Sequence, residues 1–372
     1  MMRKETNEKL CLILYQPPHY RSAIYSMIEE RINSFWYFMT YKTDIKIMDL
    51  SVFNDKGFCR LKKRFRILYC GGFTALLRKY NTFLITGDVY NLSLWIFLIR
   101  AKLLFRHKHI YLWSHGWYGK ESMVEKWIKK IFYSLSSGVF LYGNYAKDLM
   151  VSAGINSKKL FVIHNSLNYE THLKIRNSLK SSRVFKNHFN NDFKNLIFIG
   201  RLTKVKRLDL LLQSLKILIS KGENFNLTLI GDGSEQENLQ KLVKDLDIEK
   251  YVWFYGSCYD EFENSELIYN ADLCVSPGNV GLTAIHCLSF GTPVITHNNF
   301  KNQMPEFEAI KQGITGDFFK QNDVSSIANC IESWFEISKD RQHIRIKCYE
   351  EIKENWNPKH QISVLENNIK YS

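Results

Sequence analysis

Proline is scarce in this chain of 372 residues: there are six, and no low-complexity tract occurs. This scarcity argues against a long flexible linker, because such linkers are usually rich in proline, glycine or serine. Long apolar runs are missing too. After the polar start at 1–9 the chain is apolar only over 10–14, which is too short for the core of a signal peptide. Residues 92–106 are interrupted by Arg100 and Lys102 and fall short of the roughly 20 apolar residues that span a bilayer.

Metal-ligand and disulfide patterns are also missing. The chain has eight cysteines but no CxxC pair and no Cys/His ligand spacing, and Cys11, Cys70, Cys274 and Cys287 lie inside apolar runs. Buried free thiols explain this pattern better than bridges or zinc. We therefore expect a reducing compartment, the cytoplasm.

Acidic residues are rare in the first half. Residues 1–190 hold 31 basic and 12 acidic side chains, a balance of +19, whereas residues 191–372 hold 20 basic and 25 acidic ones. So uneven a charge distribution usually indicates that one half of the chain binds an anionic partner. Nucleic acid, an anionic membrane and a phosphate-rich substrate all fit this charge.

Short apolar runs alternate with longer amphipathic ones, which predicts right-handed βαβ units and parallel sheets. In the first half we expect strands at 10–15, 65–69, 83–86, 110–113, 139–142 and 160–163, and helices at 21–32, 92–105, 122–134 and 145–153. In the second half we expect strands at 195–199, 227–230, 252–255, 273–276 and 294–296, and helices at 208–220, 235–246 and from about 281.

The fold class is therefore α/β, with two tandem Rossmann-like domains. We expect a first domain at 1–170, a linker at 171–194 that lacks an apolar period, a second domain at 195–350, and a helix at 351–372 that returns to the first domain. Ligands of open α/β sheets bind at the carboxyl ends of the strands, so we expect the site in a cleft where both sets of strand ends meet.

Two glycine-containing strand ends suggest a diphosphate site. Gly200 and Arg201 follow one strand, with Lys206 five residues on, and Gly231 and Gly233 follow the next. Arginine offers a planar fork for phosphate oxygens and lysine a mobile charge. Solvated loop cations are the alternative for this pair.

The strongest segment is a strand that leads through a glycine-rich turn into a helix. The free first amides and the dipole of such a helix suit a pyrophosphate. The alternative is a strand-turn-helix element that serves packing only and binds no ligand. The donor-binding candidates here are Gly278, Asn279, Val280, Gly281, Leu282, Thr283 and His286.

Over about 195–335 the chain resembles the GT-B-fold retaining glycosyltransferases of glycosyltransferase family 4. The resemblance rests on an ordered series: Gly200-Arg201…Lys206, Gly231-Asp232-Gly233, Tyr255-Gly256, Val280-Gly281-Leu282, Gly291-Thr292-Pro293-Val294 and Glu306…Gly313…Gly316. It implies that Arg201 and Lys206 bind the donor diphosphate and stabilise it as it leaves, that the backbone around Gly281 and Leu282 supports it, and that the anomeric configuration is retained.

One departure from the family concerns its paired glutamates, which would fall on Gly278 and His286. In the family the first contacts the donor sugar and the second holds the ribose hydroxyls. Asn279 is the candidate substitute for the first. His286 can hydrogen-bond a ribose through a ring nitrogen, and a packed helix histidine is the alternative.

The first half resembles the family more faintly. Trp113-Ser114-His115-Gly116 matches the family's histidine–glycine element, which implies a catalytic place for His115 near the transferring sugar and an acceptor contact at Gly116. A structural loop histidine is the alternative. The family's first glycine-rich loop is replaced by residues 16–21, where His19 and Arg21 are acceptor-binding candidates and Arg21 can meet a phosphate.

We expect no metal and no cofactor, because Arg201, Lys206 and a helix start can neutralise a leaving diphosphate. Asp245-Leu246-Asp247 matches a metal-binding Asp-x-Asp as text but ends an amphipathic helix. The expected partners are a UDP- or GDP-sugar, a glycan or lipid-linked acceptor, and an anionic membrane. The basic stretches at 60–66 and 92–106 suit peripheral docking on the inner face of the cell membrane, with a core crossover helix as the alternative for the second.

Two other functions fit parts of the pattern. A GT-B-fold sugar-nucleotide epimerase shares the tandem architecture, but the Gly-Arg…Lys spacing favours transfer. A nucleic-acid-binding protein would explain the basic half, yet no ordered basic-aromatic repeat or known RNA-binding motif occurs.

Overall fold

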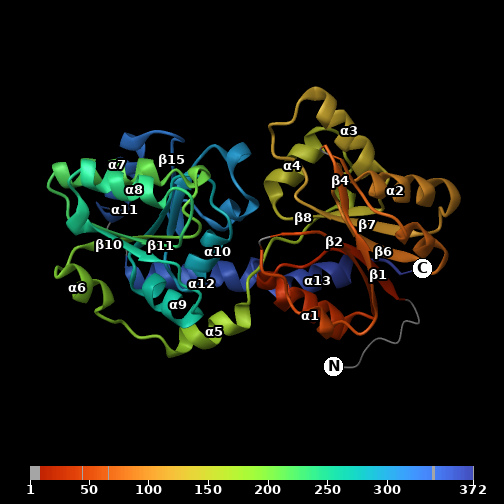
Figure 1. Ribbon diagram of the computed structural model, residues 1–372, viewed down its shortest axis with the longest axis horizontal. Helices are drawn as coiled ribbons and strands as arrows, with labels where there is room; N and C mark the ends of the chain where they lie inside the picture. Colours follow the sequence, from red (N-terminus) through yellow and green to blue (C-terminus); the bar gives the residue numbers. More distant parts are fainter. Residues whose placement is uncertain (1–8, 44, 66, 337–339, 372) are drawn as a thin grey trace. The chain divides into compact units, whose positions relative to one another are not determined.

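The computed structural model describes residues 9–43, 45–65, 67–336 and 340–371, so the polar start at 1–8 lies outside the described part. The chain forms two compact units (Figure 1). Unit 1 comprises residues 1–168 and 357–372, and unit 2 comprises residues 169–356. Each unit is built on a parallel sheet, which confirms the prediction of two Rossmann-like α/β domains.

Unit 1 holds a seven-stranded parallel sheet in the order β3-β2-β1-β6-β7-β8-β9. Its strands are β1 (Leu10–Tyr15), β2 (Ser34–Thr40), β3 (Lys56–Arg60), β6 (Thr82–Thr86), β7 (His109–Ser114), β8 (Gly138–Leu141) and β9 (Leu160–Val162). The central strand β1 is almost continuously apolar because helices cover both faces of the sheet.

Those helices divide into two groups (Figure 1). On one face the sheet packs against α2 (Leu92–Leu104), α3 (Met123–Ser134) and α4 (Asn144–Ser152) in a core that includes Phe97, Phe132 and Met150. On the other face it packs against α1 (Ser22–Arg31) and α13 (Pro358–Asn368). A capping box between Ser122 and Glu125 fixes the start of α3.

Unit 2 holds a six-stranded parallel sheet in the order β12-β11-β10-β13-β14-β15. Its strands are β10 (Lys194–Ile199), β11 (Phe225–Ile230), β12 (Val252–Gly256), β13 (Leu273–Ser276), β14 (Val294–His297) and β15 (Gly316–Phe319). Its helices are α5 (Tyr169–Ser178), α6 (Val184–Phe189), α7 (Leu208–Ser220), α8 (Gln236–Asp245), α9 (Glu261–Asn270), α10 (Leu282–Ser289), α11 (Val324–Glu336) and α12 (Arg341–Asn355).

When the strands of each main sheet are numbered in chain order without the β4–β5 hairpin, both sheets run 3-2-1-4-5-6, and unit 1 adds β9 as a seventh strand. In both sheets this order reverses beside the first strand. The reversal lies between β1 and β6 in unit 1 and between β10 and β13 in unit 2. Ligands of open α/β sheets bind at this reversal, beyond the carboxyl ends of the strands. The topology therefore marks residues just after β1 and β6, and just after β10 and β13.

Three details differ from the sequence-based expectations. The segment 171–194, expected to be a linker, carries α5 and α6 within unit 2. The chain returns to unit 1 at Asn357, which caps α13 ahead of Pro358, rather than at residue 351. The strand expected at 65–69 is shorter (β5, Ile67–Tyr69) and forms an antiparallel hairpin with β4 (Lys62–Arg64) outside the main sheet, because its charged partner strand could not be buried between helix layers.

All eight cysteines are free thiols, and Cys11, Cys274 and Cys287 are buried as expected. Cys70 is half-buried at the end of β5. No helix among the described residues is long and apolar enough to cross a membrane.

Candidate active site

The loops after β10 and β13 meet at the reversal of the unit 2 sheet. The ammonium of Lys206 donates to the Asn279 carbonyl oxygen at 2.7 Å and to its side-chain Oδ1 at 3.0 Å. The amide of Gly278 in turn donates to the carbonyl oxygen of Lys206 at 2.9 Å. Two of the three N–H groups of the lysine are thus used to hold it against the glycine-rich turn, and one remains for a ligand.

This corner of unit 2 is electropositive. Burial, and then the charge of Arg201, lower the pKa of Lys206 below its ordinary value, while the Glu306 carboxylate partly offsets the effect. Arg201 directly follows Gly200 at the end of β10 and is exposed. The positive charges of Lys206 and Arg201 repel each other beside the strand end, and a bound polyanion would offset this repulsion.

Gly278 is packed tightly against the backbone of the preceding loop. A Cβ at this position would lie 2.0 Å from the Val205 carbonyl oxygen and 2.7 Å from the Cα of Lys206. No side chain fits there unless the loop moves. A glutamate at Gly278 is therefore excluded by the same close approach that brings Lys206 to Asn279.

Gly231 and Gly233, which we expected to let the backbone approach a ligand closely, are half-buried, and neither has room for a side chain. A Cβ on Gly231 would lie 2.0 Å from the Gly200 carbonyl oxygen, and one on Gly233 would lie 2.3 Å from the Leu202 carbonyl oxygen. Gly200 and Gly231 also adopt positive φ values of 148° and 133°. These glycines let the loops after β10 and β11 pack backbone to backbone, which positions Arg201 indirectly.

The start of α10 completes this corner. Gly281 caps the helix and has room around it, since a Cβ there would meet only Met304 at 3.9 Å. The Val280 amide is already bonded to Gln303 at 2.7 Å, and the Thr283 hydroxyl donates to the Ile199 carbonyl oxygen at 2.9 Å. The first-turn amides beyond Val280 have no partner within the helix, so they are the donors that an anion can use.

His286 faces a carboxylate rather than open solvent. Its Nε2 lies 2.8 Å from Oε1 of Glu261, and Nε2 of His172 lies 3.1 Å from the same oxygen. The two imidazole rings stack with centroids 5.4 Å apart. Burial opposes ionisation of Glu261, but hydrogen bonds from His172 and His286 outweigh it and hold the pKa of this carboxyl well below its usual range. The carboxylate therefore stays ionised and joins α5, α9 and α10.

Among the described residues, these three side chains could hold a metal ion. One possible ligand atom from each lies within 4.8 Å of the other two. Their composition, two imidazoles and a carboxylate, suits zinc. The Asp-x-Asp pair lies at the end of a helix, as we predicted: Asp245 is the last residue of α8, and Asp247 follows it.

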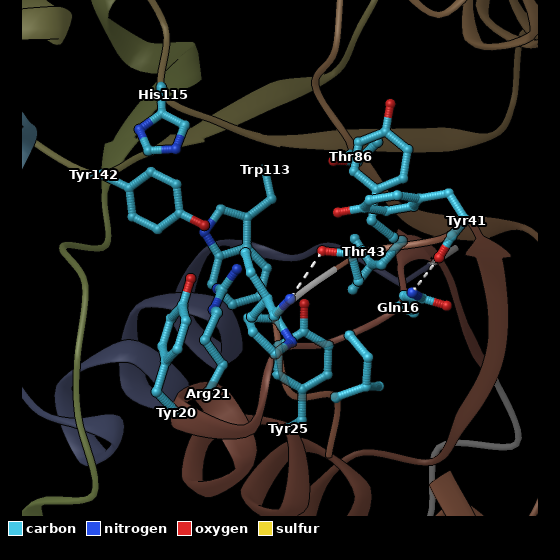
Figure 2. A pocket seen from close by; sticks show the side chains of 15 residues that line it. Gln16, Tyr20, Arg21, Tyr25, Tyr41, Thr43, Thr86, Trp113, His115 and Tyr142 are labelled. Carbon is cyan, nitrogen blue, oxygen red and sulfur yellow. Dashed lines mark hydrogen bonds between the residues drawn. The ribbon is translucent and has the colours of Figure 1, made fainter. Parts of the chain in front are cut away.

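Unit 1 has a cavity of about 290 Å³ at its own sheet reversal (Figure 2). Its walls come from the ends of β1, β6 and β7, from Tyr142 just after β8, and from residues of the segments 16–25, 41–43 and 45–47. It is lined by Leu14, Tyr15, Gln16, Pro18, Tyr20, Arg21, Tyr25, Tyr41, Thr43, Ile45, Ile47, Thr86, Trp113, His115 and Tyr142. The lining is largely aromatic, with hydroxyl groups and one basic side chain.

Arg21 and His115 both reach this cavity (Figure 2). The Arg21 guanidinium lies 4.4 Å from the centre of the Trp113 ring and 5.5 Å from that of Tyr142. Burial, and then the charge of Arg21, lower the pKa of His115 to about 4, so this histidine is neutral at pH 7. Its ring packs 4.6 Å from Tyr142, and its buried Nδ1 has no hydrogen-bond partner among the described residues.

The other two acceptor candidates lie outside the cavity lining. His19 is exposed, and its Nδ1 lies 3.3 Å from the Lys46 carbonyl oxygen. Gly116 is buried at a φ of 70°, and a Cβ on it would lie 2.8 Å from the Leu141 side chain. Gly116 thus allows the chain to turn tightly after His115, and it offers no surface to a ligand.

Sequence reasoning missed most of the aromatic lining and both partners of His286. Tyr20, Tyr41 and Tyr142 belong to three separated segments, and nothing in their spacing joins them. Glu261 starts α9 and His172 lies in a segment that we expected to be irregular. The one available signal was the pair of neighbouring acids at 260–261 after a strand, which is common at helix starts.

Comparison with known proteins identifies the family. Residues 180–351 match the model of the family described as glycosyl transferases group 1. This stretch of the chain, which lies within unit 2, matches that family. Among curated relatives, an uncharacterised 41.2 kDa protein in the cps region of Klebsiella pneumoniae is 26% identical over 271 residues, which cover 68% of this chain and 70% of the relative. Alignments with other curated relatives cover 29% to 43% of those proteins.

Solved glycosyltransferases share the fold of this chain along its length. The lipopolysaccharide outer core galactosyltransferase WaaB has a TM-score of 0.72 at 15% identity, covering 97% of this chain and 100% of that one. Anabaena Alr3699/HepE in complex with UDP has a TM-score of 0.69 at 14% identity, covering 97% and 99%. The GT-B architecture expected from the motifs is thereby confirmed.

Proposed function

We propose that this group 1 glycosyltransferase moves a hexose from a UDP- or GDP-sugar to a glycan or lipid-linked acceptor in surface polysaccharide or glycolipid synthesis, with retention at the anomeric carbon. The donor would bind unit 2 and the acceptor unit 1. The galactosyltransferase of lipopolysaccharide and the UDP-bound protein among the structural neighbours support this choice of donor and product class.

The observation that carries the proposal is the electropositive corner of unit 2. Lys206 is fixed against Asn279, Arg201 extends from the end of β10, and the first amides of α10 are unbonded within their helix. All three arise at the sheet reversal, where ligands of this fold bind. A nucleoside diphosphate supplies the two adjacent phosphates that a guanidinium, an ammonium and a helix start can bind together.

In the proposed reaction the bond between the anomeric carbon and the diphosphate oxygen breaks, and a bond from an acceptor hydroxyl to that carbon forms on the same face. The proton of the acceptor passes to the departing diphosphate oxygen. Arg201 and Lys206 stabilise the negative charge that grows on this oxygen, which lowers the barrier to departure. No metal or cofactor takes part in this scheme.

In unit 1, His115 is held neutral next to the cavity by burial and by Arg21. A neutral imidazole can donate or accept a hydrogen bond to a sugar hydroxyl without adding a charge. This fits the place near the transferring sugar that the family resemblance gives it.

Substitution at the cationic pair tests the proposal. We expect Arg201→Ala and Lys206→Ala each to reduce kcat by on the order of 10²–10³, because each removes one donor to the departing oxygen. Lys204→Ala is the matched control, since Lys204 is exposed on the same turn as Lys206. The readout is released nucleoside diphosphate, after a thermal-shift screen with UDP-, GDP-, ADP- and CMP-sugars selects the donor. Near-wild-type turnover of both variants, or release of an epimerised free nucleotide sugar, would overturn the proposal.

We further propose that unit 1 docks on an anionic membrane from the cytoplasmic side, through a surface that we call the α2–α3 face. It exposes large apolar side chains, with Met123 at 88%, Val124 at 67% and Trp127 at 66% accessible on α3, and Leu103 and Leu104 on α2. Trp95 and Phe132 pack 5.0 Å apart and join the two helices. Exposed cations on these helices and on the β4–β5 hairpin, which contacts α2, are Lys62, Lys63, Arg100, Lys102, Lys126 and Lys130.

The two readings of 92–106 both apply to α2. Leu94, Phe97, Leu98 and Ala101 are buried in the core, as a crossover helix requires, while Leu92, Ile96, Ile99, Leu103 and Leu104 are exposed. A helix that is apolar on both sides would leave a costly surface in water. Apolar side chains between clustered lysines and arginines suit insertion at an anionic lipid surface.

A further inference from the structure

Arg21 is half-buried beside the cavity, and no acidic side chain neutralises its charge among the described residues. Its Nε and Nη2 atoms are buried and have no hydrogen-bond partner among the described residues. No ion pair joins it to a described acidic residue, and neither aspartate nor glutamate lines the cavity around it. The carboxylate of Asp88 approaches the cavity only through the hydroxyl of Tyr15, 2.5 Å away.

Aromatic rings compensate part of this charge. The guanidinium lies over three of them, with ring centres at 4.4 Å for Trp113, 5.2 Å for Tyr25 and 5.5 Å for Tyr142. Such cation–π contacts stabilise a guanidinium that has lost part of its hydration. They do not replace the hydrogen bonds that its buried N–H groups would make to water, so an anion that accepts from them would stabilise the site. A rigid aromatic cage that leaves two donors unused is a site prepared for that anion.

The shape and lining of the cavity indicate what carries the anion. About 290 Å³ lies near the lower end of the range for small-molecule sites, roughly 300–1,000 Å³. Tyrosine and tryptophan present flat apolar faces to the C–H groups of a sugar ring and polar atoms to its hydroxyls. Figure 2 shows Tyr20, Tyr142 and Trp113 around the Arg21 side chain, with Tyr41 and Thr86 across the cavity.

We propose that this cavity binds an acceptor sugar that bears an anionic substituent, a phosphate or a carboxylate, and that the free Nε and Nη2 donors of Arg21 pair with it. The inference rests on the proposed function, since it names the acceptor class for the same transfer. Discrimination between charged and neutral sugars depends on Arg21 alone, because His115 adds no charge at neutral pH.

Ligand titration of the full chain by NMR or calorimetry tests the inference. The probes are glucose 6-phosphate, glucuronate, inorganic phosphate and glucose. We expect the two charged sugars to bind on the order of tenfold to a hundredfold more tightly than glucose, because a charge-assisted bidentate pair forms in a desolvated site. A preference for glucose 6-phosphate assigns a phosphorylated acceptor, and a preference for glucuronate assigns an acidic sugar.

The decisive variant is Arg21→Met, which keeps the length of the side chain and removes its charge. It should lose the preference for charged sugars. Arg31→Met is the matched control, because Arg31 is exposed at the end of the helix that Arg21 caps, and it should bind like wild type. UDP binding, measured in the same samples, reports on unit 2 and on folding. Equal binding of glucose and the charged sugars, or charged-sugar binding that Arg21→Met leaves intact, would overturn the inference even if UDP still bound.

Discussion

At the scale of single residues, Gly278 shows how a missing carboxylate follows from backbone packing. The resemblance places a glutamate there, yet its Cβ would lie 2.0 Å from the Val205 carbonyl oxygen. The loop after β10 occupies the space that a side chain at Gly278 would need. The same loop brings Lys206 into contact with Asn279. The donor sugar must therefore be held by other groups, and Asn279 is the polar side chain nearest in sequence.

Restoring the carboxylate should thus harm the protein. We expect Gly278→Glu to lose roughly 1–3 kcal/mol of unfolding free energy through overpacking, and to lose transfer because Lys206 is pushed from its place. Urea denaturation and the transfer assay measure the two effects. Gly281→Ala is the control for stability, because a Cβ at Gly281 has room. A Gly278→Glu protein that is as stable as wild type and more active would show that the packing argument is wrong.

At the scale of elements, three helices of unit 2 are joined by one carboxylate. Glu261 on α9 accepts hydrogen bonds from His172 on α5 and His286 on α10. Besides His172, α5 buries Tyr169, and the Arg176 guanidinium lies 3.8 Å from the centre of the Tyr349 ring. Part of the attachment of α5 therefore depends on this cluster, whose strength depends on its protonation state.

Acid should loosen α5. Burial lowers the pKa of His172 despite the partly offsetting Glu261 carboxylate, and the charges of His286 and Arg176 act in the same direction as burial. The unfolded chain then takes up this proton at a higher pH than the folded chain, so unfolding free energy falls as pH drops through the ordinary histidine pKa of about 6.5. Glu261, whose folded pKa is depressed, adds a further loss below about pH 4.3.

Amide hydrogen exchange in α5 and urea unfolding, both measured between pH 8 and pH 5, check this expectation. His172→Asn removes the titrating group and should flatten the pH dependence, whereas the exposed His343→Asn on α12 should leave it unchanged. Identical pH profiles for wild type and His172→Asn would contradict the assignment.

At the scale of the whole molecule, the chain order of apolar runs predicts the architecture well. β1, α7 and β13 have the bounds that we predicted from the apolar pattern, 10–15, 208–220 and 273–276. The sequence analysis did not predict β2, because a buried run of aromatic residues lacks the alternation that distinguishes a strand from a helix. The diphosphate candidates follow one another along the sequence and could be found, whereas the cavity of unit 1 and the Glu261 cluster join distant segments, which only tertiary packing brings together.

The uneven charge of the molecule leads to a test of membrane docking. The chain carries a formal charge of +14, and its basic excess lies in residues 1–190. Each lysine or arginine near an anionic surface contributes about 1 kcal/mol, and this attraction weakens with salt. We expect the protein to sediment with vesicles that mix phosphatidylglycerol and phosphatidylcholine, but not with phosphatidylcholine alone.

Trp127→Glu should weaken this binding by about tenfold, because it removes an apolar anchor from the α2–α3 face and adds a repelled charge. Tyr259→Glu is the matched control: Tyr259 is 95% accessible but belongs to unit 2, outside that face. If both variants bind like wild type, the α2–α3 face is not the membrane surface. If the wild-type protein does not sediment with the anionic vesicles, the basic residues act through a phosphate-rich substrate instead. A loss confined to Trp127→Glu would place that face, and with it unit 1, against the lipid.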